Sequence, residues 1–382
     1  MQSTRIAIIG GGLSGLYAAM LLEARGIRDY EVLEARETFG GRIASWPDAS
    51  RPHEEAIGKL PIAGRFDMGA TWYWPAMHPE LQQLVAQLGL ETVAQHENGD
   101  MLIERSRIHA PTRVDGFVSA PPALRLAGGM AALVDAIRAH LPAERLLVEH
   151  QVTALRQLGE RIEVQTQDAF GQVVSRHVTH VLLAIPPRLA ANTIDFAPAL
   201  PDALQRQWQA CGTWMAPHAK YVAVYDTPFW REQGLSGEAR SAVGPMGEIH
   251  DASAEGGDAA LFGFLGVSAQ IRQQTPEAVL LSHCRAQFVR LFGEQAARPK
   301  AEFLKDWASD PRTAVAADAH QDVGHPIPPY RTPPDGPWKG CLAGIASEWS
   351  PHFPGYVAGA VEAARLGVEA LLSPHTAASI LN

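Results

Sequence analysis

The sequence predicts an α/β fold that begins with a strand, a glycine-rich turn, a helix and a second strand. Arg5–Ile9 is a short apolar run with β-branched residues, which is typical of a strand buried on both faces. Leu13–Ala24 carries apolar and alanine residues at helical spacing, and Gly26 is placed to end that helix. Tyr30–Leu33 has the pattern of the second strand. Together these elements predict a Rossmann-type unit.

The glycines between the first strand and the helix indicate a dinucleotide site. Gly10, Gly12 and Gly15 have G-x-G-x-x-G spacing, and Glu34 follows Gly15 by 19 residues. The first glycine permits the turn, the second lets the backbone approach a pyrophosphate, and the third allows close helix–strand packing. Helix amides and the helix dipole then receive the phosphates, while the acid accepts hydrogen bonds from a ribose. The alternative is a glycine-rich turn in an unrelated α/β domain, but the glycines, both strands and the acid together favour a dinucleotide site.

The continuation ARETFGGRI favours FAD over NAD. Arg36, Gly41 and Arg42 form a second basic, glycine-bearing loop beside the first, which suits a longer cofactor whose pyrophosphate needs further cationic contacts. These residues resemble the flavin-containing amine oxidase family, which includes monoamine, polyamine and L-amino-acid oxidases. The resemblance implies a GR2-type FAD-binding domain, with adenosine at Glu34 and the pyrophosphate near Gly12–Gly15 and Arg42.

Four internal segments extend the resemblance. RFDMGATWYW (Arg65–Trp74) is similar to the family segment that lines the isoalloxazine ring, and Leu126–Leu141 resembles a helix opened by a Gly-Gly pair. We expect Leu146–Leu155 to form one strand, in which the family counterpart of Val152 touches the adenine through its backbone. Thr179–Pro187 is an apolar strand ended by prolines, and it is similar to the family strand beneath the FAD.

The block from Lys339 to Leu372 forms the second strong match. An apolar strand runs to Gly344, the turn Pro354–Tyr356 follows, and Val357–Leu372 is an alanine-rich helix. In the family this helix points its N-terminus at the flavin pyrimidine, where it stabilises negative charge; alone, the pattern fits a packed core helix equally well. The family acid soon after Ala-Gly is absent here, and Glu348 is a candidate substitute.

The cofactor-binding residues implied by the resemblance come from both glycine loops, the ring segment and the last block: Gly10, Gly12, Leu13, Ser14, Gly15, Glu34, Ala35, Arg36, Gly41, Arg42, Gly69, Ala70, Thr71, Trp72, Val152, Gly344, Tyr356 and Val357.

Three residues are implied as catalytic. Lys220 begins the apolar run Lys220–Trp230 and is similar to the family lysine that holds a water against flavin N5; without that context it fits a surface lysine. Tyr356 matches one wall of an aromatic cage that orients the amine, or it is a buried tyrosine that caps the turn. Trp307 matches a family tryptophan close to the flavin.

One stretch departs from the family pattern. Covalent members carry a flavin-linking cysteine and then the second cage tyrosine shortly after the tryptophan, whereas Ser309–Asp318 contains neither residue type. We therefore expect FAD to be bound noncovalently. The opposite wall of the cage is missing or comes from another residue.

The matching segments divide the chain into two interleaved domains. Residues 1–74, 123–203 and 300–382 are predicted to form the FAD-binding domain, and 75–122 and 204–299 an α+β substrate-binding domain. The latter contains helical patterns at His78–Leu90 and Glu277–Gly293. His325–Trp338 is rich in proline and is predicted to be a surface loop.

The resemblance implies an FAD-dependent amine oxidoreductase. A primary or secondary amine, or an amino acid, would be oxidised to an imine by hydride transfer to flavin N5. Reoxidation by O2 would give H2O2, and hydrolysis of the imine would release ammonia. A desaturase or porphyrinogen-type oxidase that acts on C–C bonds is one alternative, and a flavin-binding protein without turnover is another. The identity, size and charge of the substrate stay open.

Composition limits the classes of partner and the cellular compartment that we expect for the protein. The chain has 382 residues, 46% of them hydrophobic, and a net charge of −9, which argues against a nucleic-acid partner. No stretch approaches the ~20 apolar residues of a membrane span, and the early strand leaves no room for a signal peptide. The three cysteines lie far apart, as in a cytoplasmic protein with reduced thiols and no metal. His78, His250 and His325 have no partner at ligand spacing. We expect a monomer or a homodimer.

Overall fold

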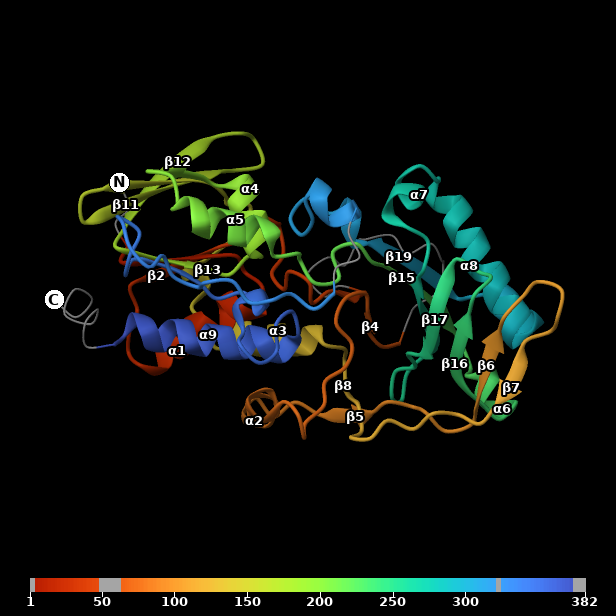
Figure 1. Cartoon of the computed structure of the whole chain (residues 1–382). Coiled ribbons are helices and arrows are strands. Elements are labelled where there is room, and N and C mark those ends of the chain that lie inside the picture. The colour runs from red at the N-terminus through yellow and green to blue at the C-terminus, as the bar shows by residue number, and fades with distance from the viewer. Residues whose placement is uncertain (1–3, 48–62, 321–323, 374–382) are drawn as a thin grey trace.

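The computed structural model describes residues 4–47, 63–320 and 324–373 and contains a five-stranded parallel sheet at the centre of one lobe (Figure 1). Its strand order is β20-β13-β1-β2-β9. The strands are, in that order, Leu342–Gly344, His180–Leu183, Ile6–Ile9, Tyr30–Leu33 and Leu146–Leu147. The predicted α/β fold is confirmed.

Each face of this sheet is covered by a different layer. On one face lie α1 (Leu13–Ala24), α2 (Pro79–Gln87), α3 (Ala131–Ala139) and α9 (Val357–Leu371). On the other lies an additional sheet of β12 (Val173–Val178), β11 (Arg161–Gln167), β10 (Gln151–Leu158) and β14 (Asp195–Ala197), with α4 (Pro187–Thr193) and α5 (Asp202–Ala210) beside it (Figure 1). Because side chains alternate along a strand, Ile6 and Ile8 join the helical core while Ala7 and Ile9 join the other.

The second lobe is built on a seven-stranded sheet. Its strands in spatial order are β19 (Ala301–Asp306), β15 (Ala219–Tyr225), β18 (Ala259–Leu265), β17 (Met246–Asp251), β16 (Leu235–Ser241), β6 (Asp100–Glu104) and β7 (Thr112–Val114). Three helices accompany it: α6 (Phe229–Glu232), α7 (Ala269–Gln273) and α8 (Glu277–Phe292). Two short pairs, β3 (Ser45–Trp46) with β4 (Phe66–Asp67) and β5 (Thr92–Ala94) with β8 (Leu124–Leu126), complete the sheets.

Two predicted strands differ from the structure. Leu146–Leu155 is not one strand, because Glu149 adopts a positive φ of 58° and separates β9 from β10, which belong to different sheets. The strand predicted over Lys220–Trp230 ends at Tyr225, and the Pro-Phe-Trp sequence begins α6 instead. In contrast, α1 and β2 have the predicted bounds.

The division into two domains stays a prediction, although two elements lie apart from their expected neighbours. Helix α2 packs with α1 and α9 in one core, and β19 pairs with β15 in the seven-stranded sheet. The proline-rich segment from His325 to Trp338 has no regular structure, as expected of a loop, but its end is inside the protein because Trp338 is fully buried.

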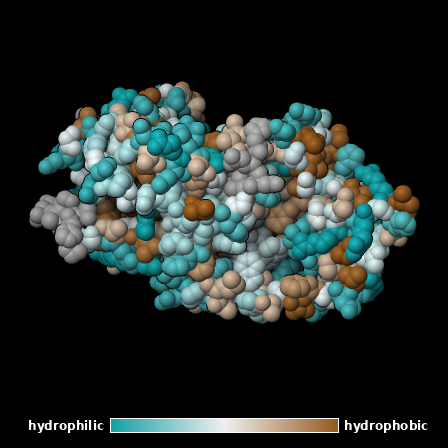
Figure 2. Space-filling model, viewed as in Figure 1, coloured by the Kyte–Doolittle hydropathy of each residue, from teal (hydrophilic) through white to brown (hydrophobic). Residues whose placement is uncertain are grey.

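The surface is mixed in character. On the face shown in Figure 2, hydrophobic residues lie scattered among hydrophilic ones, which is ordinary for a folded protein. Among the described residues, no helix has both the length and the apolar character that crossing a bilayer requires.

Candidate functional site

A cavity of about 350 Å³ gathers most of the predicted site residues. It extends from the ends of β1 and β2 to the start of β15. Its lining includes Gly10, Gly12, Leu13, Ser14, Glu34, Arg36, Gly41, Arg42, Gly69, Ala70, Thr71, Trp72, Lys220, Trp307, Tyr356 and Val357. Segments that are distant in the sequence therefore meet at one place, as the resemblance implies.

Four predicted residues lie outside this lining. Ala35 follows Glu34 at the end of β2. Val152 packs its side chain in the core between the two sheets of the first lobe. Gly344 ends β20, where an added Cβ would lie 2.2 Å from the Trp349 ring. Gly15 lies in α1 against β1, where a Cβ would be 2.0 Å from the Gly10 carbonyl oxygen. The cofactor contacts implied for these four residues stay predictions.

The glycine turn leaves the start of α1 open toward the cavity. Gly12 is the N-cap residue with φ −74°, and no side chain caps the helix. A Cβ on Gly12 would have its nearest neighbour 3.8 Å away, at Gly40. The first-turn residues Leu13 and Ser14 also line the cavity. Uncapped helix amides beside a backbone without a side chain form a cradle for an anion.

Glu34 and Arg36 define the end of the cavity beside β2. Glu34 is 3% exposed; one carboxylate oxygen accepts from Gly11 N at 2.7 Å and the other from Arg36 N at 2.9 Å. The Arg36 guanidinium donates to Asp310 at 3.1 Å and to Thr313 at 2.9 Å. The acid is thereby fixed by backbone amides, with lone pairs still free to accept hydroxyl donors.

Arg42 lines the cavity but is also ion-paired. Its guanidinium donates to Glu348 at 2.9 Å, to Ser347 at 3.1 Å and to the Trp214 carbonyl at 3.3 Å. Glu348 is fully buried and also accepts from Trp214 N at 3.3 Å. Glu348, the candidate substitute acid, therefore fixes Arg42 and does not itself line the cavity.

Lys220 is buried at the inner end of the cavity, with 1% of its surface exposed. Its Nζ donates to Thr71 Oγ1 at 2.5 Å and to the Gly69 carbonyl at 3.1 Å, and it lies 4.1 Å from the centre of the Phe262 ring. Burial lowers the pKa of Lys220 to about 7, and the nearby Asp67 carboxylate only partly opposes that shift. An amine with this pKa can hold or release a proton near neutral pH.

Two tryptophans line the same cavity as Lys220. Trp307 is buried and donates Nε1 to the Met68 carbonyl at 3.1 Å. Trp72 donates Nε1 to Gln95 at 2.8 Å and meets the His250 ring edge-on at 4.9 Å between centroids. Both indoles are oriented by hydrogen bonds, so their ring faces are held in place at the cavity wall.

The sequence interpretation missed a group of aromatic rings around Tyr356, which is the N-cap residue of α9. His325 stacks on Tyr356 at 4.7 Å and on Trp214 at 3.9 Å between centroids, and the Tyr356 hydroxyl is 2.9 Å from His325 Nε2. His325 therefore does have a partner at a candidate site, although across 31 residues. Trp214 lies six residues before Lys220 and also lines the cavity.

No cysteine lines the cavity in the part of the chain that the structure describes. Cys211 and Cys284 are buried, and burial raises the pKa of each thiol to about 12. Burial also raises the pKa of Cys341. Protonated thiols outside the cavity are poor candidates for a covalent link to a bound group.

A family model described as flavin-containing amine oxidoreductase matches residues 13–124 and 106–372. Two relatives cover different shares of the chain. A protein described as a flavin-containing monoamine oxidase, AofH, of Mycobacterium tuberculosis is 30% identical over 92% of this chain and 94% of its own length. Putrescine oxidase of Kocuria rosea is 27% identical over 60% of this chain, and that match spans only 50% of the relative.

Solved structures share the fold over nearly the whole chain. Putrescine oxidase bound to putrescine superposes with a TM-score of 0.76 at 19% identity, covering 97% of this chain and 99% of that one. Cyclohexylamine oxidase from Brevibacterium oxydans gives a TM-score of 0.76 at 21% identity, with coverages of 96% and 98%.

Proposed function

Because the chain belongs to the flavin-containing amine oxidoreductase family, we propose that it binds FAD noncovalently and oxidises an amine or amino acid to an imine. The observation that carries the proposal is the position of Lys220. Its buried ammonium lies in the same cavity as the glycine turn and Glu34, so one elongated ligand can contact all three. When bound, FAD supplies the hydride acceptor and passes the electrons on to O2, which gives H2O2.

The residues present fit the adenosine and pyrophosphate parts of FAD. The uncapped start of α1 and the bare Gly12 backbone suit a pyrophosphate. Glu34 retains acceptor capacity for the ribose hydroxyls, because each of its oxygens accepts one amide bond. Arg36 and Arg42 contribute positive charge, although Arg36 is also paired with Asp310 and Arg42 with Glu348.

Lys220 has two roles in the proposed reaction. As an ammonium it donates to Thr71 and Gly69 and places positive charge where O2 must accept electrons. With its pKa lowered to about 7, it also exchanges a proton with the water that hydrolyses the imine. The amine itself must lose a proton before it reacts, so the rate at which the amine reduces the flavin is expected to rise from neutral to mildly alkaline pH.

Tyr356 and Trp214 are proposed to orient the amine. Their ring centroids lie 6.3 Å apart, and both rings line the cavity. Trp214 thus takes the place of the second cage wall that Ser309–Asp318 does not supply. Aromatic faces attract a substrate nitrogen while excluding water from its carbon neighbours.

Replacement of the Tyr356 ring tests this assignment. In the Tyr356→Leu variant, kcat/KM for an amine is expected to fall roughly tenfold, because a cation–π or dipole contact of about 1–2 kcal/mol is removed. Tyr356→Phe keeps the ring and loses only the bond to His325, so it should stay close to wild type. Steady-state kinetics that rank the two variants equally would contradict the role of the ring.

Noncovalent binding makes a simple prediction about the flavin. Precipitation of the purified protein with acid is expected to leave the yellow colour in the supernatant, because no cysteine lines the described cavity. The absorbance of supernatant and pellet gives the released fraction. Flavin that stays with the pellet after washing would show a covalent link and refute this part of the proposal.

The proposed function as a whole is tested by mixing the purified protein anaerobically with a panel of amines and amino acids. A substrate should bleach the visible absorbance of the oxidised flavin, and admission of O2 should restore the colour with release of peroxide and ammonia. Bleaching by a compound without nitrogen, with no ammonia, would favour chemistry on C–C bonds. A flavin that no donor bleaches would favour a binding protein without turnover.

A further inference from the structure

A second cavity, of about 440 Å³, lies in the other lobe. It is formed by the segment after β5, the loop that leads into β8, helix α6 and the turn between β17 and β18. The Trp72–Gln95 hydrogen bond of 2.8 Å stands between the two cavities, because Trp72 lines the first and Gln95 the second. The second cavity is therefore a separate space with its own wall.

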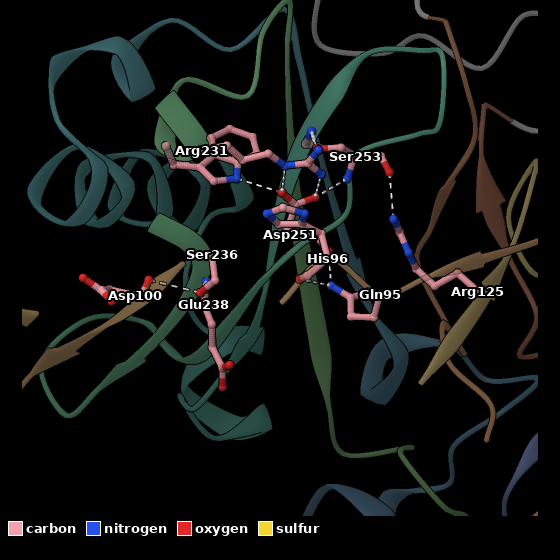
Figure 3. A network of polar contacts seen from close by, with 11 residues as sticks. Gln95, His96, Asp100, Arg125, Arg231, Ser236, Glu238, Asp251 and Ser253 are labelled. Atoms are coloured by element: carbon pink, nitrogen blue, oxygen red, sulfur yellow. Dashed lines mark hydrogen bonds and ion pairs between the residues drawn. The ribbon is translucent and has the colours of Figure 1, made fainter. Parts of the chain in front are cut away.

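Arg125 is an enclosed cation in this wall without a carboxylate partner. Its Nη2 donates to the Ser253 carbonyl at 2.8 Å, as Figure 3 shows. Its Nε is buried and has no partner among the described residues, and no carboxylate of those residues lies within the 4.0 Å ion-pairing distance of its guanidinium. Burial lowers the pKa of this guanidinium, and the charges of Asp251, Asp67 and Glu255 oppose that shift only in part.

Asp251, the acid whose charge acts most strongly on Arg125, already accepts two hydrogen bonds on each oxygen. One of its oxygens accepts from Arg231 and Trp230, each at 2.8 Å, and the other accepts from Arg231 at 2.9 Å and from Ser253 N at 2.8 Å. Figure 3 shows these contacts converging on Asp251 while Arg125 approaches Ser253 from the other side. Asp251 therefore neutralises Arg231 and leaves the charge of Arg125 unmatched.

The other acids near the cavity make their hydrogen bonds to groups other than Arg125 or are exposed to water. The two Glu97 oxygens accept from the Ser119 amide and hydroxyl at 2.7 Å. Asp67 accepts from the Met130 amide at 2.8 Å. Glu255 lines the cavity but is exposed to water. None of these carboxylates forms an ion pair with Arg125 within the described ranges.

His96 supplies a second unpaired group in the same wall. Its Nε2 is buried and has no partner in the described part of the chain. Burial lowers the pKa of His96, and the neighbouring Arg231 adds to that shift. Nε2 of the protonated imidazole is a hydrogen-bond donor, and an anion beside the ring favours that protonated form, so two enclosed nitrogens that can donate to an anion line one space.

We propose that the second cavity binds a small oxyanion, a carboxylate or a phosphate, through Arg125 and His96, with Arg231 alongside. An oxyanion supplies acceptors for both unpaired nitrogens and compensates the guanidinium charge. The groups of this site do not line the first cavity, although the charge of Arg125 also contributes to lowering the pKa of Lys220.

The test uses the purified full-length protein and two probes, sodium acetate and inorganic phosphate, titrated calorimetrically at neutral pH with the ionic strength held constant by chloride. At least one probe should bind and raise the melting temperature. In Arg125→Gln the affinity should fall at least tenfold, because a charge-assisted contact is lost. Arg125→Lys keeps the positive charge but loses the planar guanidinium with its several donors, so it should bind the probe with intermediate affinity. Arg206→Gln is the control, since Arg206 is an exposed residue of α5.

The relative response to acetate and phosphate identifies the kind of oxyanion. If Arg125 had only a structural role, Arg125→Gln would lower the melting temperature equally with and without the probe. If Arg125 binds the anion, the substitution should abolish only the rise in melting temperature that the probe causes. Absence of binding by both probes, or a rise in melting temperature that survives in Arg125→Gln, would overturn the proposal.

Discussion

In the Lys220→Met variant, reoxidation of the flavin by O2 is expected to slow on the order of 100-fold, while the flavin content stays close to wild type. The charge of Lys220 is enclosed, with two hydrogen bonds to the Gly69–Thr71 loop, and a preorganised charge in a dry site contributes this much to a rate. Methionine fills a similar volume, so the surrounding rings should keep their places. Stopped-flow mixing of the prereduced protein with O2 measures the rate.

The matched control is Lys339→Met, at an exposed position, which should leave reoxidation unchanged. An Lys220→Met protein that reoxidises at the wild-type rate would remove Lys220 from the oxygen reaction. Loss of flavin in that variant would instead indicate that the lysine serves binding.

The same variant also isolates the pH dependence of stability that Lys220 causes. Its folded pKa is about 7 and its ordinary value is 10.5, so between these pH values the unfolded chain holds a proton that the folded protein has released. Stability conferred by this group therefore rises with pH across that window. The free energy of unfolding of wild type relative to Lys220→Met should increase by up to about 4 kcal/mol from pH 7 to 10.5. Denaturation of both flavin-free proteins across the window measures this difference.

Two alanine substitutions in the glycine turn should affect different properties, one the stability of the fold and the other the affinity for FAD. In Gly15→Ala the new Cβ lies 2.0 Å from the Gly10 carbonyl oxygen, so α1 must move away from β1, and a loss of about 3 kcal/mol or more of stability is expected. In Gly12→Ala the nearest atom is 3.8 Å away and the backbone φ of −74° suits alanine. That variant should fold normally but bind FAD at least tenfold more weakly, about 1.4 kcal/mol, because a methyl group occupies the approach of the pyrophosphate.

Unfolding of the flavin-free proteins and titration with FAD, followed by flavin fluorescence, separate the two effects. Equal stability of Gly15→Ala and wild type would contradict the packing role of Gly15. Unchanged FAD affinity in Gly12→Ala would place the pyrophosphate elsewhere, because this substitution leaves the fold intact.

The first lobe could be predicted from the sequence because local chemistry defines it. Buried β-branched runs, helical spacing and glycines specify β1, α1 and β2 within a few residues, and Glu34 lies at a fixed distance along the chain. The single strand expected over Leu146–Leu155 was wrong, because Glu149 has a positive φ. The amides of Glu149 and His150 donate to the loop around Glu34, and such long-range contacts have no signature in composition.

The aromatic group and the second cavity could not be predicted in this way. Trp214, His325 and Tyr356 come from three distant segments and meet only in the folded chain. In the sequence, Arg125 has the pattern of an ordinary arginine in a short alternating strand. That it lacks a carboxylate partner is known only once the structure shows that Asp251 is paired with Arg231. Local patterns carry no information on such long-range pairings.

The ion pair between Arg42 and Glu348 has a consequence for the order in which the cavity is assembled. It joins two residues that lie 306 positions apart in the sequence, and the Trp214 segment is hydrogen-bonded to both. The edge strand β20 and the helix α9 also come from the last part of the chain. The cavity therefore gains its full set of walls only after segments from distant parts of the sequence have docked on one another, so it is a property of the completed fold and of no single segment.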